Sequence, residues 1–169
     1  MPPSGRPALE HLQAAVALPV PPAQAFSQFT GRFALWWPAE FSWSGADLLE
    51  DIGIEDGEGG FLYERGPHGF RLDWGRVLEW QPPHRLRFTW QIGPDRVPVP
   101  DPAHASEVDV AFVAEPGGGT RVEVRHGCWE RHGEGAATYR EQFAHAWPYA
   151  LGRLREHVLA DAGHDGAEG

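Results

Sequence analysis

The segment 75–90 constrains the fold most, because it has the pattern of two antiparallel strands joined by a turn. In its second half, Leu86, Phe88 and Trp90 alternate with arginine and threonine, as expected for a strand with one buried face. The Pro82-Pro83 pair separates the two halves, and proline cannot donate a hydrogen bond to a neighbouring strand. The segment therefore predicts a β-hairpin with one apolar face.

The rest of the chain continues this pattern, with glycine and proline at the boundaries between periodic segments. It predicts one strand, two short helices, six strands and one long helix. The strands are expected at residues 9–20, 47–55, 61–65, 70–80, 85–92, 106–115 and 120–126. The helices are expected at residues 21–31, 32–37 and about 136–159, and the proline-rich segment 93–105 is expected to be a loop.

The long helix has one apolar face, formed by residues such as Tyr139, Phe143 and Trp147. Such a helix after an antiparallel sheet is expected to lie across the concave face of that sheet, giving an α+β fold. Pro148 is expected to kink or split it. The length of 169 residues suits one domain, expected over residues 9–160, with disordered ends at 1–8 and 161–169.

Composition excludes several classes of function. The net charge of −10 disfavours nucleic acid and anionic membranes as partners. Cys128 is the only cysteine, which excludes a disulfide framework, and the 9 histidines lack the spacing of metal ligands. We expect no metal and no cofactor. No apolar run suggests a signal peptide or a membrane span, so we expect a cytoplasmic protein without membrane insertion.

Four stretches resemble, in their order and spacing, the START-like (SRPBCC) superfamily, and in particular its branch named after the activator of the heat-shock-protein-90 ATPase. They are the proline-led segment 21–30, the glycine-pair turn 58–61, the hairpin 75–90, and the segment 119–126 with its following helix. The resemblance covers about residues 9–159. It implies a helix-grip fold, in which a curved antiparallel sheet of about six to seven strands wraps around a long C-terminal helix, with two short helices after the first strand.

The resemblance also implies a ligand cavity between the sheet and the long helix. Large aromatic side chains with inward parity are candidates for its wall, although the same parity suits a filled core. The candidate ligand-binding residues are Trp37, Phe61, Tyr63, Trp74, Arg76, Phe88, Trp90, Phe112, His126, Phe143 and Trp147.

Three of these candidates have distinct alternatives. Arg76 would anchor an anionic ligand if it faces inward with Trp74, but the opposite parity of its strand faces inward in the second interpretation. His126 would be an acid–base group, or a structural histidine bonded to the backbone. Trp37 would gate the cavity, or plug the space between the short helices and the sheet.

The leading functional prediction is the binding of a hydrophobic or amphipathic small molecule, without catalysis. The first alternative is an enzyme of the cyclase or aromatase type acting in the same cavity. The second is a chaperone-associated regulator, as the family name implies. A stress-related role is expected for the small-molecule binding of the leading prediction. The protein is expected to be a monomer or a homodimer.

Overall fold

The computed structural model describes the backbone of residues 9–168 and the side chains as far as Asp161. The disorder predicted for residues 1–8 falls outside this range. Disorder is also predicted for residues 161–169, and of these only Asp161 has a described side chain. Both stay predictions.

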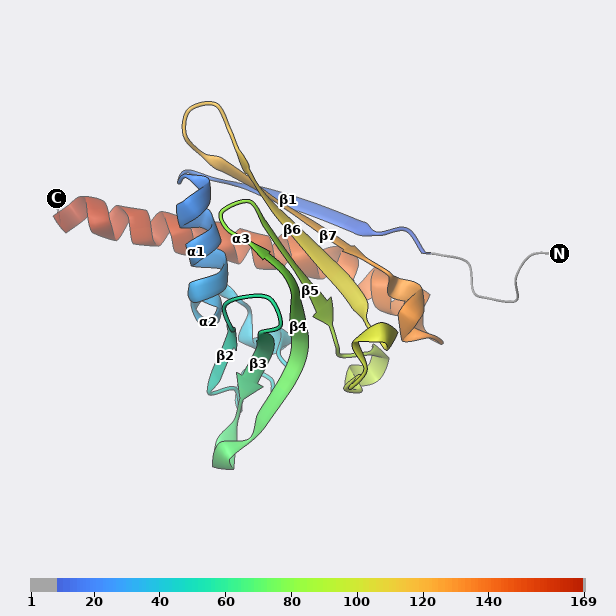
Figure 1. The fold of residues 1–169 in the computed structure, drawn as a ribbon. Coiled ribbons are helices and arrows are strands. Elements are labelled where there is room, and N and C mark those ends of the chain that lie inside the picture. Colours follow the sequence, from blue (N-terminus) through green and yellow to red (C-terminus); the bar gives the residue numbers. More distant parts are fainter. Residues whose placement is uncertain (1–8, 169) are drawn as a thin grey trace.

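Seven strands form one antiparallel sheet in the order β1-β7-β6-β5-β4-β3-β2 (Figure 1). The two edges of the sheet are therefore β1 and β2, which lie far apart in space although they are neighbours among the strands in sequence. The predicted α+β helix-grip fold is confirmed. The strands are β1 (Leu12–Leu18), β2 (Asp51–Ile54), β3 (Phe61–Arg65), β4 (Arg71–Gln81), β5 (Arg85–Trp90), β6 (Ser106–Ala114) and β7 (Thr120–Gly127).

Three α-helices accompany the sheet. The short helices α1 (Pro22–Gly31) and α2 (Phe33–Trp36) follow β1, and α3 (Ala136–Glu168) runs across one face of the sheet (Figure 1). Of the two outcomes expected at Pro148, a split does not occur, because α3 continues through that residue. Five 3₁₀ turns connect the elements, η1 (Ala39–Phe41), η2 (Pro67–Gly69), η3 (Pro94–Arg96), η4 (Pro102–His104) and η5 (Trp129–His132).

The second strand is shorter than the alternation predicts. Residues 47–50 do not join it, because the backbone N–H groups of Leu48 and Leu49 bond to the carbonyl of Gly45 in a turn. Leu48 is consequently exposed rather than part of the inner face. Leu48 has the same parity as Ile52 and Ile54, so the sequence pattern placed the start of the predicted strand too early.

Two β-bulges in β4 decide which of its side chains face inward. Opposite β3, Leu62 pairs with Gly75 and Tyr63 pairs with Asp73, so Trp74 has no partner on that strand. Opposite β5, the register shifts again after Val77. An extra residue reverses the alternation of the side chains that follow it. Trp74 and Val77 are therefore both buried, although they have opposite parity in the sequence.

The core lies between the sheet and the helices. Leu151, Leu154 and Val158 of α3 are buried in the same cluster as the inner residues of β6 and β7. Burying one such side chain stabilises the fold by about 1.5–3 kcal/mol. The core is therefore continuous along α3 from Leu151 to Val158. The cavity described next lies beside the N-terminal half of α3.

Candidate functional site

A cavity of about 430 Å³ lies between the N-terminal half of α3, the segment that follows α2, and the end of β5. These three elements are distant in sequence and meet only because α3 crosses the sheet. The volume is within the range of small-molecule sites. Seven of the lining side chains are aromatic, namely Trp37, Phe41, Trp43, Trp90, Tyr139, Phe143 and Trp147.

The aromatic walls pack on one another and are held by hydrogen bonds. The ring of Trp37 lies 5.6 Å from that of Trp147 and 5.9 Å from that of Trp90, and Trp90 lies 5.1 Å from Phe143, all between centroids. The Trp90 indole donates to the Tyr139 hydroxyl at 2.9 Å, which itself donates to the Ile92 carbonyl at 2.6 Å. Burial raises the pKa of Tyr139, so this hydroxyl keeps its proton. The walls are therefore preorganised and apolar.

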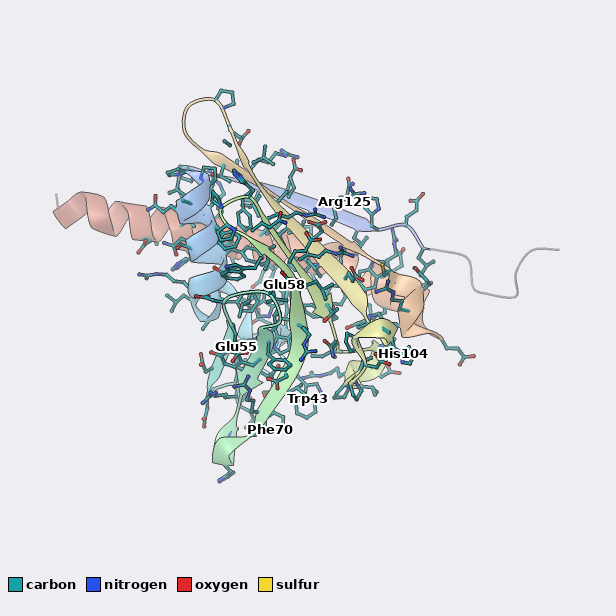
Figure 2. The ribbon with its side chains drawn as sticks, in the orientation of Figure 1. Trp43, Glu55, Glu58, Phe70, His104 and Arg125 are labelled. Atoms are coloured by element: carbon teal, nitrogen blue, oxygen red, sulfur yellow. The ribbon has the colours of Figure 1, made fainter. Side chains whose placement is uncertain are left out.

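The rim of the cavity is polar and exposed, and it consists of Glu40, Asp95, Arg96 and Gln142. At this rim, two loops are fastened to each other by reciprocal bonds. The Arg96 guanidinium donates to the carbonyls of Ser42 and Trp43, and the Trp43 indole donates to the Arg96 carbonyl at 2.9 Å. The ring of Trp43 also stacks on Phe70 at 5.4 Å, and Figure 2 shows the two beside each other. An apolar interior with a polar rim suits an amphipathic ligand.

Glu64 of β3 holds one of these loops in place. Its side chain is buried, and its carboxylate accepts bonds from the backbone N–H of Trp43 at 2.9 Å and of Ser44 at 2.8 Å. The Ser44 hydroxyl donates a third bond. A buried carboxylate is tolerated only when it is bonded in this way. Glu64 therefore positions Trp43 in the cavity wall.

His126 lies behind the cavity wall in a network of side chains. It is fully buried, and its ring stacks on Trp129 at 3.8 Å between centroids. The Trp147 indole lies 3.0 Å from Nδ1 of His126, and the Ser106 hydroxyl lies 2.8 Å from Nε2. An indole nitrogen only donates, so Nδ1 must accept, and neutral His126 carries its proton on Nε2. His126 then donates to Ser106, whose hydroxyl lies 2.7 Å from Nε2 of His132.

The environment keeps this network neutral. Burial lowers the pKa of His126 well below 6.5, and the nearby His132 lowers it further. Burial also lowers the pKa of His132 to about 4. His126 thus fits a structural role better than an acid–base role, but both of its ring nitrogens bond to side chains, and not to the backbone as the structural alternative expected. Its role is to support Trp147, which lines the cavity.

The structure brings only part of the predicted set together. Trp37, Trp90, Phe143 and Trp147 line the cavity, and Trp74 lines a small void beside it. Three of the remaining residues are buried in the core outside the cavity wall, and three lie on the other face of the sheet. The core residues are Phe88, Phe112 and His126, and the residues on the other face are Phe61, Tyr63 and Arg76.

Arg76 does not face the cavity, because the bulge at Trp74 turns it outward. It is exposed, and its guanidinium carbon lies 4.8 Å from the centre of the Phe61 ring. Tyr63 lies on the same face, where the Arg71 guanidinium carbon lies 4.7 Å from its ring centre and Asp51 accepts from its hydroxyl at 3.4 Å. The outward direction of Arg76 matches the second interpretation, in which the opposite parity of its strand faces inward, and Val77 is buried as that interpretation requires.

Several residues of the site were missed by the sequence analysis. Tyr139 belonged to the apolar face of the predicted helix, so its periodicity could have identified it. Trp43, Glu64 and Arg96 had no such signal. Trp43 lies in a loop, Arg96 ends the short turn η3, and the partners of Glu64 lie in the loop of Trp43. Their positions depend on tertiary contacts between segments that are far apart in sequence.

Two further properties bear on the type of site. Within residues 9–161, no three or more His, Cys, Asp or Glu side chains gather closely enough to hold a metal ion. In the same part of the chain, none of the helices has the length and apolar character needed to cross a membrane.

Comparison with solved structures finds relatives over nearly the whole chain. The anthrahydroquino-gamma-pyrone synthase Txn09, solved in complex with SUM, is 34% identical, with 89% of this chain and 99% of that chain covered and a TM-score of 0.62. The self-sacrificing resistance protein CalC from Micromonospora echinospora is 26% identical, with 90% and 96% covered and a TM-score of 0.64. Protein NE0264 from Nitrosomonas europaea, at 20% identity with 92% and 97% covered and a TM-score of 0.63, supports the fold alone.

No curated protein sequence matches this chain. The family model described as "Activator of Hsp90 ATPase homolog 1-like protein" matches residues 19–158. That range begins before α1 and ends within α3, so it includes every element that contributes to the cavity wall. The chain therefore belongs to the family of Activator of Hsp90 ATPase homolog 1-like proteins.

Proposed function

We propose that this protein binds a flat, mostly apolar aromatic molecule in the cavity beside α3. The observation that carries the proposal is the composition of the wall, in which seven aromatic side chains surround about 430 Å³. Aromatic rings favour edge-to-face and offset contacts with other rings. The exposed polar rim would keep hydroxyl or glycosyl substituents of the ligand in contact with water.

The comparisons support an aromatic ligand. One relative is named as an anthrahydroquino-gamma-pyrone synthase, and its name describes a fused-ring aromatic compound. At 34% identity over 89% of this chain, a shared ligand class is a reasonable proposal for the same cavity. Neither the name of the family nor the fold identifies the ligand by itself.

Catalysis of a ring-forming step is the second candidate, and the same relative favours it because it is named as a synthase. The groups on the described wall give this candidate less support. The Tyr139 hydroxyl already donates to the Ile92 carbonyl, and burial raises its pKa. His126 is enclosed by Ser106 and Trp147. Glu40 and Asp95 at the rim are the carboxylates that would remain for proton transfer.

The binding proposal is tested by titrating the protein with tricyclic aromatic compounds and following tryptophan fluorescence and the melting temperature. Phe143→Ala removes an aromatic wall and should weaken binding about tenfold, since burial of a ring against it contributes about 1–2 kcal/mol. Phe61→Ala is the matched control, because Phe61 is also half-buried but lies on the other face of the sheet.

Saturable binding that Phe143→Ala weakens and Phe61→Ala leaves unchanged is the expected result. Equal weakening by both variants, or no binding by any tricyclic compound, would contradict the proposal. Catalysis would appear as a change in the mass or absorption spectrum of a bound polyketide, and loss of that change in Glu40→Gln or Asp95→Asn would favour the second candidate.

A further inference from the structure

The indole nitrogen of Trp74 is buried without an acceptor. Trp74 is 2% exposed, and within the described residues no oxygen or nitrogen accepts from its Nε1. An indole N–H can only donate, and buried donors are nearly always paired in native proteins. Trp74 faces inward at the bulge of β4, so it brings a free donor to the inner side of the sheet.

A void of about 10 Å³ lies beside Trp74. Six of its nine lining residues also line the main cavity, including Trp37 and Trp90, so the void lies next to that cavity. Its volume suits one atom of the size of a water oxygen and excludes a ring. A ligand whose rings fill the main cavity can therefore extend one small substituent towards Trp74.

We propose that the Trp74 indole is the inner hydrogen-bond donor of the binding site, and that the ligand is an aromatic compound with a neutral acceptor oxygen, such as a ketone or quinone carbonyl, which occupies this void. The inference rests on the proposed function and deepens it, since it names a chemical group that the ligand must carry. It separates oxygenated aromatic ligands from hydrocarbons and from lipid acyl chains.

The charge around the void restricts the oxygen further. Glu64 also lines it, and the Glu64 carboxylate is buried and already bonded to Trp43 and Ser44. An anionic oxygen beside this buried carboxylate would be repelled. A neutral carbonyl oxygen accepts from the indole without adding charge. The void therefore selects a neutral acceptor over a carboxylate or phenolate.

The test compares 9-fluorenone with fluorene, two tricyclic compounds that differ by one carbonyl oxygen. Their affinities are measured on the wild-type protein and on Trp74→Phe, which removes the donor and keeps an aromatic ring. Trp80→Phe is the matched control, since Trp80 lies on the same strand but packs on Phe26 away from the void. In parallel, ¹⁵N–¹H spectra of the wild-type protein follow the indole signal of Trp74, assigned by triple-resonance connectivities.

Wild-type protein should bind 9-fluorenone about tenfold more tightly than fluorene, the size expected for satisfying one buried donor. Trp74→Phe should remove this preference and Trp80→Phe should keep it. The Trp74 indole proton should move downfield with 9-fluorenone alone. This wild-type signal tests the inference even where Trp74→Phe does not fold.

Two results would overturn the inference. If both compounds bind equally and the Trp74 signal does not respond to the carbonyl, the donor has a resident water as its partner, and the proposed function stands without this refinement. If neither compound shifts the signals of Trp37, Trp90 or Trp147, which line the main cavity, the proposed function fails and the inference fails with it.

Discussion

Protonation of the buried histidine network should destabilise the protein below neutral pH. His126 is fully buried, and burial holds its pKa well below 6.5 in the folded state. As the pH falls, the unfolded chain therefore binds a proton at this position before the folded protein does. The contribution of neutral His126 to the free energy of unfolding is fully present above pH 6.5, and it is lost as the pH falls towards the pKa of His126 in the folded state.

The magnitude follows from this difference in proton binding. One histidine that is protonated only in the unfolded state lowers the free energy of unfolding by about 1.4 kcal/mol per pH unit, or about 2 kcal/mol between pH 7 and pH 5. His132, with its pKa lowered to about 4, acts in the same direction. It adds a loss of similar size over this range, because it too stays mostly neutral at pH 5 in the folded protein. Most carboxylates stay ionised in this range, so they add little.

Urea denaturation at pH 7, 6 and 5, followed by tryptophan fluorescence, measures this effect. His126→Gln should be less stable at pH 7 but should lose about 2 kcal/mol less than the wild type on going to pH 5. His84→Gln replaces an exposed histidine and should keep the wild-type pH dependence. If His126→Gln does not fold, ¹⁵N spectra of the wild-type imidazole should show a neutral ring at pH 5. A pH dependence that is unchanged in His126→Gln, or a protonated ring at pH 5, would show that His126 does not stay neutral in the folded protein.

Three other substitutions test separate parts of the structure. Glu64→Gln should lower the free energy of unfolding by about 2–4 kcal/mol in urea denaturation and weaken ligand binding, because it disturbs the bonds to Trp43 and Ser44. Glu50 is exposed, so Glu50→Gln should do neither. Phe112→Ala should lower the free energy of unfolding by about 3–5 kcal/mol in the same assay, because Phe112 packs on Phe26 and Phe29 in the core. Phe112 lies outside the cavity, so the folded variant should keep its ligand affinity. Arg76→Ala should change both stability and affinity little, by less than about 1 kcal/mol, and a large loss of affinity for an anionic ligand would contradict the outward position of Arg76.

The fold was predictable because half-buried strands leave an alternating pattern. In β5, β6 and β7 every inner residue has the parity that the sequence indicates, since these strands pair without interruption. In β4 the parity failed as a guide, because the bulges at Trp74 and after Val77 shift the alternation inside one strand. The second interpretation of Arg76 was right about its outward direction, but neither parity alone accounts for the burial of both Trp74 and Val77.

The site was predictable in part for a related reason. Trp90, Phe143 and Trp147 belong to periodic elements, so their inward direction followed from the pattern. The hydrogen bonds between Trp43 and Arg96 join two segments that are 53 residues apart, and no local sequence pattern indicates such a contact. The inward direction of Trp74 followed from the alternation, but the missing acceptor for its indole could not be predicted, since it depends on the tertiary surroundings of Nε1.

A crystal structure of the protein soaked with 9-fluorenone would locate the ligand and its carbonyl oxygen directly, without reference to affinity. We predict the ring system between the Trp37, Trp90 and Phe143 side chains, with the carbonyl oxygen within hydrogen-bond distance of Nε1 of Trp74. Ring density in the groove between α2 and β2 instead, or a cavity that stays closed to every aromatic compound soaked at saturating concentration, would contradict it.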